Sequence, residues 1–177
     1  MITTQFHQGH KELLKDAVVI AEEMTSEYFK LSLSEWRRAR YDILTLQDLR
    51  QEEVSPHALA LVAKYDGRHQ DRLLKSAGFD FYRICLQDHN ILKTLESGKL
   101  HLQPLLIYIL IHELVHVVRF SRFLAFFDAS CDQRRREEGL VHQVTRQILG
   151  RLNSLDFHPV IRHYENDRQG GRQYAHL

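Results

Sequence analysis

Two histidines and a glutamate, in the stretch His112-Glu113-Leu114-Val115-His116, are the side chains of this chain best suited to chemistry. On a helix, residues four positions apart are neighbours, so His112 and His116 can reach one tetrahedral metal ion. Glu113 lies about 100° further round the axis, where it can address a water molecule on that metal. The pattern is typical of a zinc hydrolase with Glu113 as the catalytic general base.

The residues around this motif are apolar, which strengthens the metal interpretation. A polar group set into an apolar helix is costly unless something pairs it, and a metal ion is one such partner. The alternative is a buried polar cluster that holds no metal. The flanking and intervening apolar residues are Leu110, Ile111, Leu114, Val115, Val117 and Val118.

A zinc enzyme needs a third protein ligand, while water takes the fourth position. After His116 the sequence has a polar break at residues 128–133, and the next helix is predicted from about Arg134 to Leu149. Two helices joined by a short connection pack antiparallel, so this helix returns towards the motif. Its candidate ligands are Glu137, Glu138 and His142.

The predicted phase of this helix leaves the choice between the two acids open. Glu137 points close to the centre of the apolar arc, whereas Glu138 lies at its edge beside His142. We favour Glu138 as the third metal ligand, because it forms one polar patch with His142. The role of His142 itself stays open between an additional ligand, a partner that orients a ligand, and a residue of the helix face.

With these residues in place, the chain resembles the gluzincins, a superfamily of zinc metallopeptidases in which a glutamate on a later helix joins the two histidines. The resemblance covers about residues 105–149. It implies a zinc ion as cofactor, hydrolysis of a peptide or protein substrate, and Glu113 as the base that takes a proton from the attacking water. In several such families an aspartate follows the ligand glutamate by four residues, and here His142 stands in its place.

The segment Phe79–Gln87 is the clearest predicted strand, because it is rich in aromatic and apolar residues and follows a glycine. In the resembling families an active-site strand pairs with the extended substrate, so we expect this segment to offer its edge. The reaction also needs a hydrogen-bond donor for the developing oxyanion. Candidates are His142, Tyr108 and Tyr82.

Helical periodicity predicts most of the remaining elements. An amphipathic helix is expected from His10 to about Leu31, and a second one is expected to open at the Ser32/Glu35 capping box and continue to Ile43. Ser55-Pro56 favours a third helix, although Val62–Tyr65 could form a strand instead. Further helices are expected from Asp88 to Gly98 and from Pro104 through the motif.

Together these elements predict a mainly α (α+β) fold, in which a helical domain surrounds a buried central helix that carries the motif. A small strand element near residues 79–87 completes it. A length of 177 residues suits one domain, which we expect over residues 1–165. Residues 166–177 are polar and contain glycine, and we expect a flexible tail there.

Composition bears on partners and location. The chain has 24 basic and 23 acidic residues, so no nucleic-acid partner is expected. The apolar segment Leu105–Phe127 contains several charged or titratable residues, and we expect a buried helix and no membrane insertion. Cys85 and Cys131 form no recognisable spacing pattern, which favours a cytoplasmic setting with Cys85 as a core residue.

Two other functions remain open at this point. One is a ferritin-like di-iron protein, because Glu113 to His116 is also a Glu-x-x-His element to which Glu23 or Glu27 could add a carboxylate. The other is a non-enzymatic domain whose metal site is structural or vestigial. The sequence predicts neither the substrate's cleavage site nor the oligomeric state.

Overall fold

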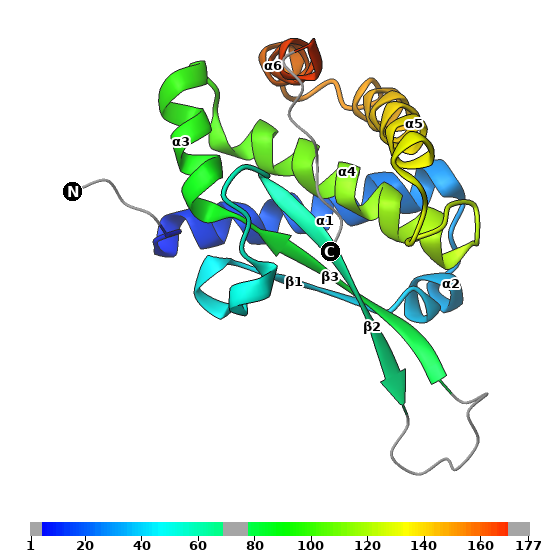
Figure 1. The fold of residues 1–177 in the computed structure, drawn as a ribbon. Helices are drawn as coiled ribbons and strands as arrows, with labels where there is room; N and C mark the ends of the chain where they lie inside the picture. Colours follow the sequence, from blue (N-terminus) through cyan, green and yellow to red (C-terminus); the bar gives the residue numbers. More distant parts are fainter. Residues whose placement is uncertain (1–4, 69–77, 170–177) are drawn as a thin grey trace.

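Helix α4 (Leu102–Ser121) lies at the centre of the fold, and the other elements are arranged around it (Figure 1). The computed structural model describes residues 5–68 and 78–169. Helix α1 (Gln8–Phe29) packs along one side of α4, α5 (Cys131–Leu149) packs along another, and a three-stranded sheet covers a third. The fold is mainly α (α+β), as predicted.

The sequence of α4 explains its central place. Pro104 occupies the first turn, where the missing N–H leaves no hydrogen bond unmade, and the helix continues with apolar residues on every side. By length and composition α4 could cross a lipid bilayer, yet 89% of its most apolar window is buried inside the protein. Its hydrophobicity is that of a core helix wrapped by neighbours.

The two helices that cover α4 are amphipathic and have clear ends. On α1 the buried residues Leu14, Ala17, Ala21 and Met24 follow helical spacing, and the helix ends where Lys30 adopts a left-handed conformation, with φ of 52°. Helix α5 begins at Cys131, earlier than predicted. The reason is a capping box at Ser130, a sequence signal that our prediction missed.

The sheet has the strand order β1-β3-β2. Strand β3 (Gly78–Leu86) confirms the predicted strand, and it lies between β1 (Tyr41–Leu44), which is parallel to it, and β2 (Ala60–Arg68), which is antiparallel. The expectation that this strand offers an edge to substrate is therefore wrong, because both of its sides are already paired. The edges of the sheet are β1 and β2.

Two predicted helices differ from the structure. Helix α2 (Leu33–Arg38) begins at the Ser32/Glu35 capping box but ends at Arg38, and Tyr41 and Ile43 belong to β1. The helix expected from Ser55-Pro56 is absent from the described chain. The Ser55 hydroxyl accepts from the backbone of His57 and Ala58, as a helix cap would, but from Ala60 on the chain pairs with β3 as strand β2.

One of the remaining elements was predicted from the sequence, and three were not. Helix α3 (Asp88–Gly98) is formed as expected and ends at Lys99, another left-handed residue. Two single-turn helices, η1 (Leu46–Asp48) and η2 (Gln51–Glu53), lie between β1 and β2. Helix α6 (His158–Gln169) takes in the first residues of the segment that we expected to be a tail, and 170–177 lie outside the described residues.

Candidate metal centre

The two motif histidines lie one turn apart on α4 and face the same way. Their Nε2 atoms are 3.3 Å apart. Both side chains are buried, with 3% of His112 and 1% of His116 exposed. The rigid, fully covered helix therefore holds the two imidazoles together before any ligand arrives.

Glu138 of α5 completes the group. One of its carboxylate oxygens lies 3.1 Å from Nε2 of His116, and the other lies 3.4 Å from Nε2 of His112. The ligand atoms of the three residues all lie within 4.8 Å of one another. We refer to His112, His116 and Glu138 as the metal triad, because this group could hold a metal ion.

Antiparallel packing of α4 and α5 brings these residues together. Near the end of α4, Arg119 meets Glu137 at the start of α5; one turn back, His116 meets Glu138; and one turn further, His112 meets His142. The step from His116 back to His112, one turn of α4, is matched by the step from Glu138 on to His142, one turn in the opposite direction along α5, whereas Glu137 and Glu138 are adjacent residues. The short connection between the helices thus sets the register of the site.

The structure distinguishes Glu137 from Glu138, the two acids between which the predicted helix phase left the choice of third ligand open. Glu137 binds the guanidinium of Arg119 through both of its oxygens, one of them at 2.9 Å. Glu138, one residue or about 100° further round the helix, turns instead to the two histidines. The predicted ligand was Glu138, and it is the acid that joins the metal triad.

His142 lies beside the metal triad and outside it. Its Nδ1 is 2.8 Å from the hydroxyl of Tyr108, and its ring centroid is 4.5 Å from that of His112. Tyr108 in turn stacks on Tyr164 of α6, with the ring centroids 4.2 Å apart. This contact fixes the orientation of the His142 ring and leaves Nε2 as the nitrogen that faces away from Tyr108.

The donor set suits zinc in both chemistry and spacing. Zinc commonly binds imidazole nitrogen and carboxylate oxygen in a tetrahedral arrangement, with bonds that place neighbouring ligand atoms about 3.3 Å apart. The two imidazole nitrogens are 3.3 Å apart, and they lie 3.4 and 3.1 Å from the two different oxygens of Glu138. With one ligand atom taken from each residue, the three atoms lie within 4.8 Å of one another, so a small adjustment of the side chains would place them as three corners of such a tetrahedron.

Glu113, the predicted general base, is 5% exposed and follows His112 on α4. Its carboxylate acts electrostatically on Cys85 of β3. Burial, followed by the charges of Glu53, Asp42 and Glu113, raises the pKa of the Cys85 thiol to about 12. Cys85 is therefore a protonated core residue, as expected from the sequence, and Glu113 lies within electrostatic range of β3.

Aromatic rings line the end of the site near His116. Phe120 lies 5.8 Å from His116 between ring centroids, and Tyr82 and Phe127 pack on Phe120 at 6.1 and 5.4 Å. Burial, followed by the nearby Asp80, raises the pKa of Tyr82 to about 12, so the phenol is protonated at neutral pH. Of the three predicted oxyanion donors, His142 and Tyr108 lie beside the metal triad and Tyr82 lies behind Phe120.

A second group of polar side chains, built around the buried Glu53, occupies the other face of the sheet, and sequence reasoning missed it. Arg83 of β3 binds Asp42 through two nitrogens and Glu53 through a third, and the hydroxyl of Tyr65 also donates to Glu53. Glu53 is fully buried. We call these four residues the charged cluster. Its one available signal was an arginine among the apolar residues in the second half of the predicted strand.

Comparison of this chain with protein-family models, with curated proteins and with solved structures found no match in any of the three.

Proposed function

We propose that this protein is a zinc-dependent metallopeptidase that hydrolyses peptide bonds in a peptide or protein substrate. One observation carries the proposal. Two imidazoles and a carboxylate from two different helices converge with separations of 3.1 to 3.4 Å, and a further glutamate adjoins the first histidine. Three protein ligands and a fourth position for water are the usual composition of a catalytic zinc site.

In this proposal His112, His116 and Glu138 hold the zinc ion. When bound, zinc supplies a Lewis acid that polarises a peptide carbonyl and lowers the pKa of a coordinated water to about 7. Glu113 takes a proton on its carboxylate and passes it to the leaving amine. His142, oriented by Tyr108, supplies a hydrogen bond to the developing oxyanion.

The edge of the sheet at β2 is suited to pair with an extended peptide substrate. Strand β2 is an edge strand, is antiparallel to β3 and has more contacts with α4 than β3 has. A peptide that pairs with its outer side extends the sheet over the face of the motif helix (Figure 1). We therefore assign substrate pairing to β2, in place of the Phe79–Gln87 strand expected from the sequence.

The di-iron alternative has less support. A di-iron site in a helical bundle needs carboxylates from further helices that point inward. Glu23 and Glu27, the two candidates on α1, are both exposed. A structural zinc site is the stronger rival, because a fourth protein ligand such as His142 would close the position that water needs.

Metal analysis of the purified protein tests the site. We expect about one zinc per chain, strongly reduced by His112→Ala and by Glu138→Gln. His101→Ala, which changes an exposed histidine at the start of the same helix, is the matched control and keeps its zinc. Two irons per chain favour the di-iron protein, and absence of any bound metal removes the proposal.

The enzymatic claim has its own test. Glu113→Gln keeps the shape and the metal triad, so it retains zinc while hydrolysis of quenched fluorescent casein falls by about 10²-fold or more. A wild-type protein that holds zinc but cleaves neither casein nor a quenched peptide library supports the structural site. Equal activity of Glu113→Gln and wild type removes Glu113 from the mechanism.

A further inference from the structure

A groove of about 850 Å³ follows the outer edge of β1, on the side of the molecule where α1 and α2 meet the sheet. None of its lining residues belongs to the metal triad or to its neighbours on α4 and α5. The residues that carry the argument below are Lys15, Val19, Glu22, Arg37, Tyr41 and Asp42.

The strand edge itself is the first observation. On its inner side β1 pairs with β3, where the backbone N–H of Tyr82 donates to the carbonyl of Arg40 at 2.9 Å. Backbone groups of successive strand residues point alternately to the two sides, so Tyr41 and Ile43 direct theirs into the groove. The part of the chain that the structure describes places no strand there.

Helix α1 supplies a surface beneath this edge. Lys15, Val18, Val19 and Glu22 follow helical spacing and form one stripe along the groove, and Val19 is 62% exposed. Trp36 of α2 packs near Tyr41, with ring centroids 5.5 Å apart. A strand added to β1 therefore finds backbone partners on one side and apolar side chains below it.

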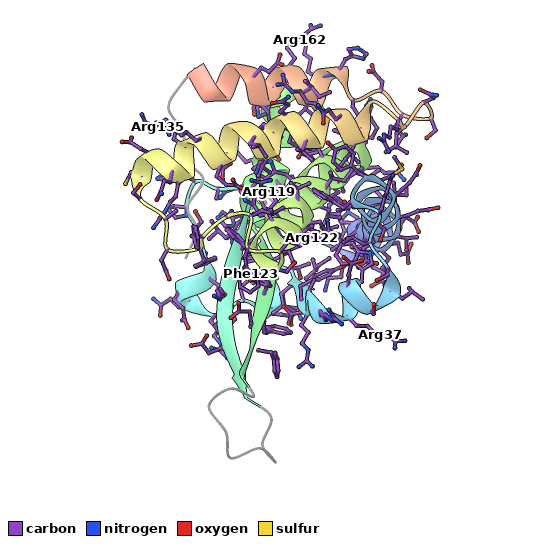
Figure 2. All side chains as sticks on the ribbon, turned by 90° about the vertical axis from the view of Figure 1, so that its right-hand side faces the viewer. Arg37, Arg119, Arg122, Phe123, Arg135 and Arg162 are labelled. Carbon is purple, nitrogen blue, oxygen red and sulfur yellow. The ribbon has the colours of Figure 1, made fainter. Side chains whose placement is uncertain are left out.

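The acidic and the basic side chains that line the groove differ in whether other residues of the fold bind them. Glu22 accepts a hydrogen bond from Tyr41, and Asp42 is held by Arg83 at 2.9 Å, so both acids have partners within the fold. Lys15 and Arg37 form no ion pair with any residue in the described ranges 5–68 and 78–169. Figure 2 shows Arg37 at the α2 side of the molecule. The groove therefore presents positive charge to a ligand.

We propose that the β1 groove binds an acidic, extended segment of a partner protein by strand addition. The partner's backbone pairs with Tyr41 and Ile43, its inward side chains cover Val18 and Val19, and its carboxylates face Lys15 and Arg37. This site is separate from the substrate edge at β2, because the two strands lie on opposite sides of β3.

Binding of a designed peptide tests the proposal. The probe is a fluorescein-labelled peptide of alternating valine and glutamate, measured by fluorescence anisotropy against the full-length protein. We expect saturable binding that is lost when alternate backbone nitrogens of the peptide are methylated, because strand addition depends on backbone hydrogen bonds. Replacing glutamate by lysine in the peptide weakens binding about tenfold or more.

Two neighbouring arginines provide matched protein variants. Arg37→Glu reverses a charge that lines the groove and weakens binding about tenfold, whereas Arg38→Glu changes an exposed residue outside the lining and alters binding less than about twofold. Because both changes are at exposed positions, folding is preserved in each. In ¹⁵N spectra the peptide shifts the amide signals of Val19 and Ile43, while those of the metal triad stay in place.

Three outcomes overturn the proposal. The first is no binding of the acidic peptide. The second is binding that backbone methylation and Arg37→Glu leave unchanged. The third is a concentration-dependent dimer in analytical ultracentrifugation that Val19→Asp dissociates, because the occupant of the groove is then a second copy of this chain.

Discussion

The charged cluster and the metal triad are both groups of polar side chains with buried members, but they differ in the source of positive charge. In the charged cluster Arg83 lies between Asp42 and Glu53, so the cation belongs to the chain. In the metal triad Glu138 faces two imidazoles, while the neighbouring Arg119 binds Glu137. A buried carboxylate that pairs with an arginine of the same chain stabilises the fold. A carboxylate that lies beside two imidazoles is suited to bind a cation from solution.

Removal of metal gives the largest expected effect. A zinc ion at 100 times its dissociation constant stabilises the native protein by about 2.7 kcal/mol. Glu138→Gln abolishes this gain, so chelator treatment lowers the thermal midpoint of the wild type but not of the variant. The midpoint of Glu53→Gln still responds to chelator. A response to chelator in Glu138→Gln would place the metal elsewhere.

The next largest effect is on the charged cluster. Glu53→Gln leaves the part-buried Arg83 with one of its two carboxylate partners, and we expect the free energy of unfolding to fall by about 2 kcal/mol. Urea denaturation measures this, with exposed Glu52→Gln as the control. Equal stability of Glu53→Gln and Glu52→Gln would show that the contacts of Glu53 with Arg83 and Tyr65 do not stabilise the fold.

Low pH is expected to weaken the contribution of Glu53 in the charged cluster to stability. Burial by itself raises the pKa of Glu53, but hydrogen bonds from Tyr65, from the Arg50 backbone and from Arg83 outweigh it and hold the pKa below its ordinary value. A carboxyl with a lowered folded-state pKa stabilises the protein above its unfolded-state pKa, and this contribution is lost as pH falls. The stability difference between wild type and Glu53→Gln therefore narrows below about pH 4.5. Urea titrations at pH 6 and pH 3.5 measure it.

The smallest expected effect on stability is that of Glu137, the residue next to the proposed ligand Glu138. Glu137→Gln breaks a mostly buried ion pair with Arg119, an α4 residue labelled in Figure 2, and lowers the free energy of unfolding by about 1 kcal/mol. Zinc content stays at the wild-type level, in contrast to Glu138→Gln. Loss of zinc in both variants would mean that Arg119 and Glu137 hold the α5 register on which the site depends.

Local patterns predicted the central parts of this fold. The periodicity of α1, the apolar run of α4 and the aromatic strand β3 each carry their signal within one segment, and all three are confirmed. The four-residue strand β1 was missed, because its parallel pairing with β3 depends on residues about 40 positions away. Without that partner, Tyr41 and Ile43 suited an extension of the preceding helix.

For the site, as for the fold, the sequence predicted the local spacing but not the contacts between elements. The spacing of His112 and His116 is local, and it correctly placed both on one helix face. Glu138 was favoured from the sequence because it forms a polar patch with His142, but only the register between α4 and α5 in the structure brings it, and not Glu137, to the two histidines. The contact between Tyr108 and His142 joins residues on two helices, and only the folded chain shows that these two candidates act as a pair.

The members of the metal triad are anchored to different degrees. His112 and His116 belong to α4, which neighbours cover on every side, whereas α5 has one buried face and its Glu138 side chain is 15% exposed. Helices with more exposed backbone open more readily than core helices. Under the proposed function, an ion held by the triad is expected to leave through local opening of α5, with the histidine pair still in place. The lifetime of the loaded protein is then set by α5, and hydrogen exchange at its amides reports the rate.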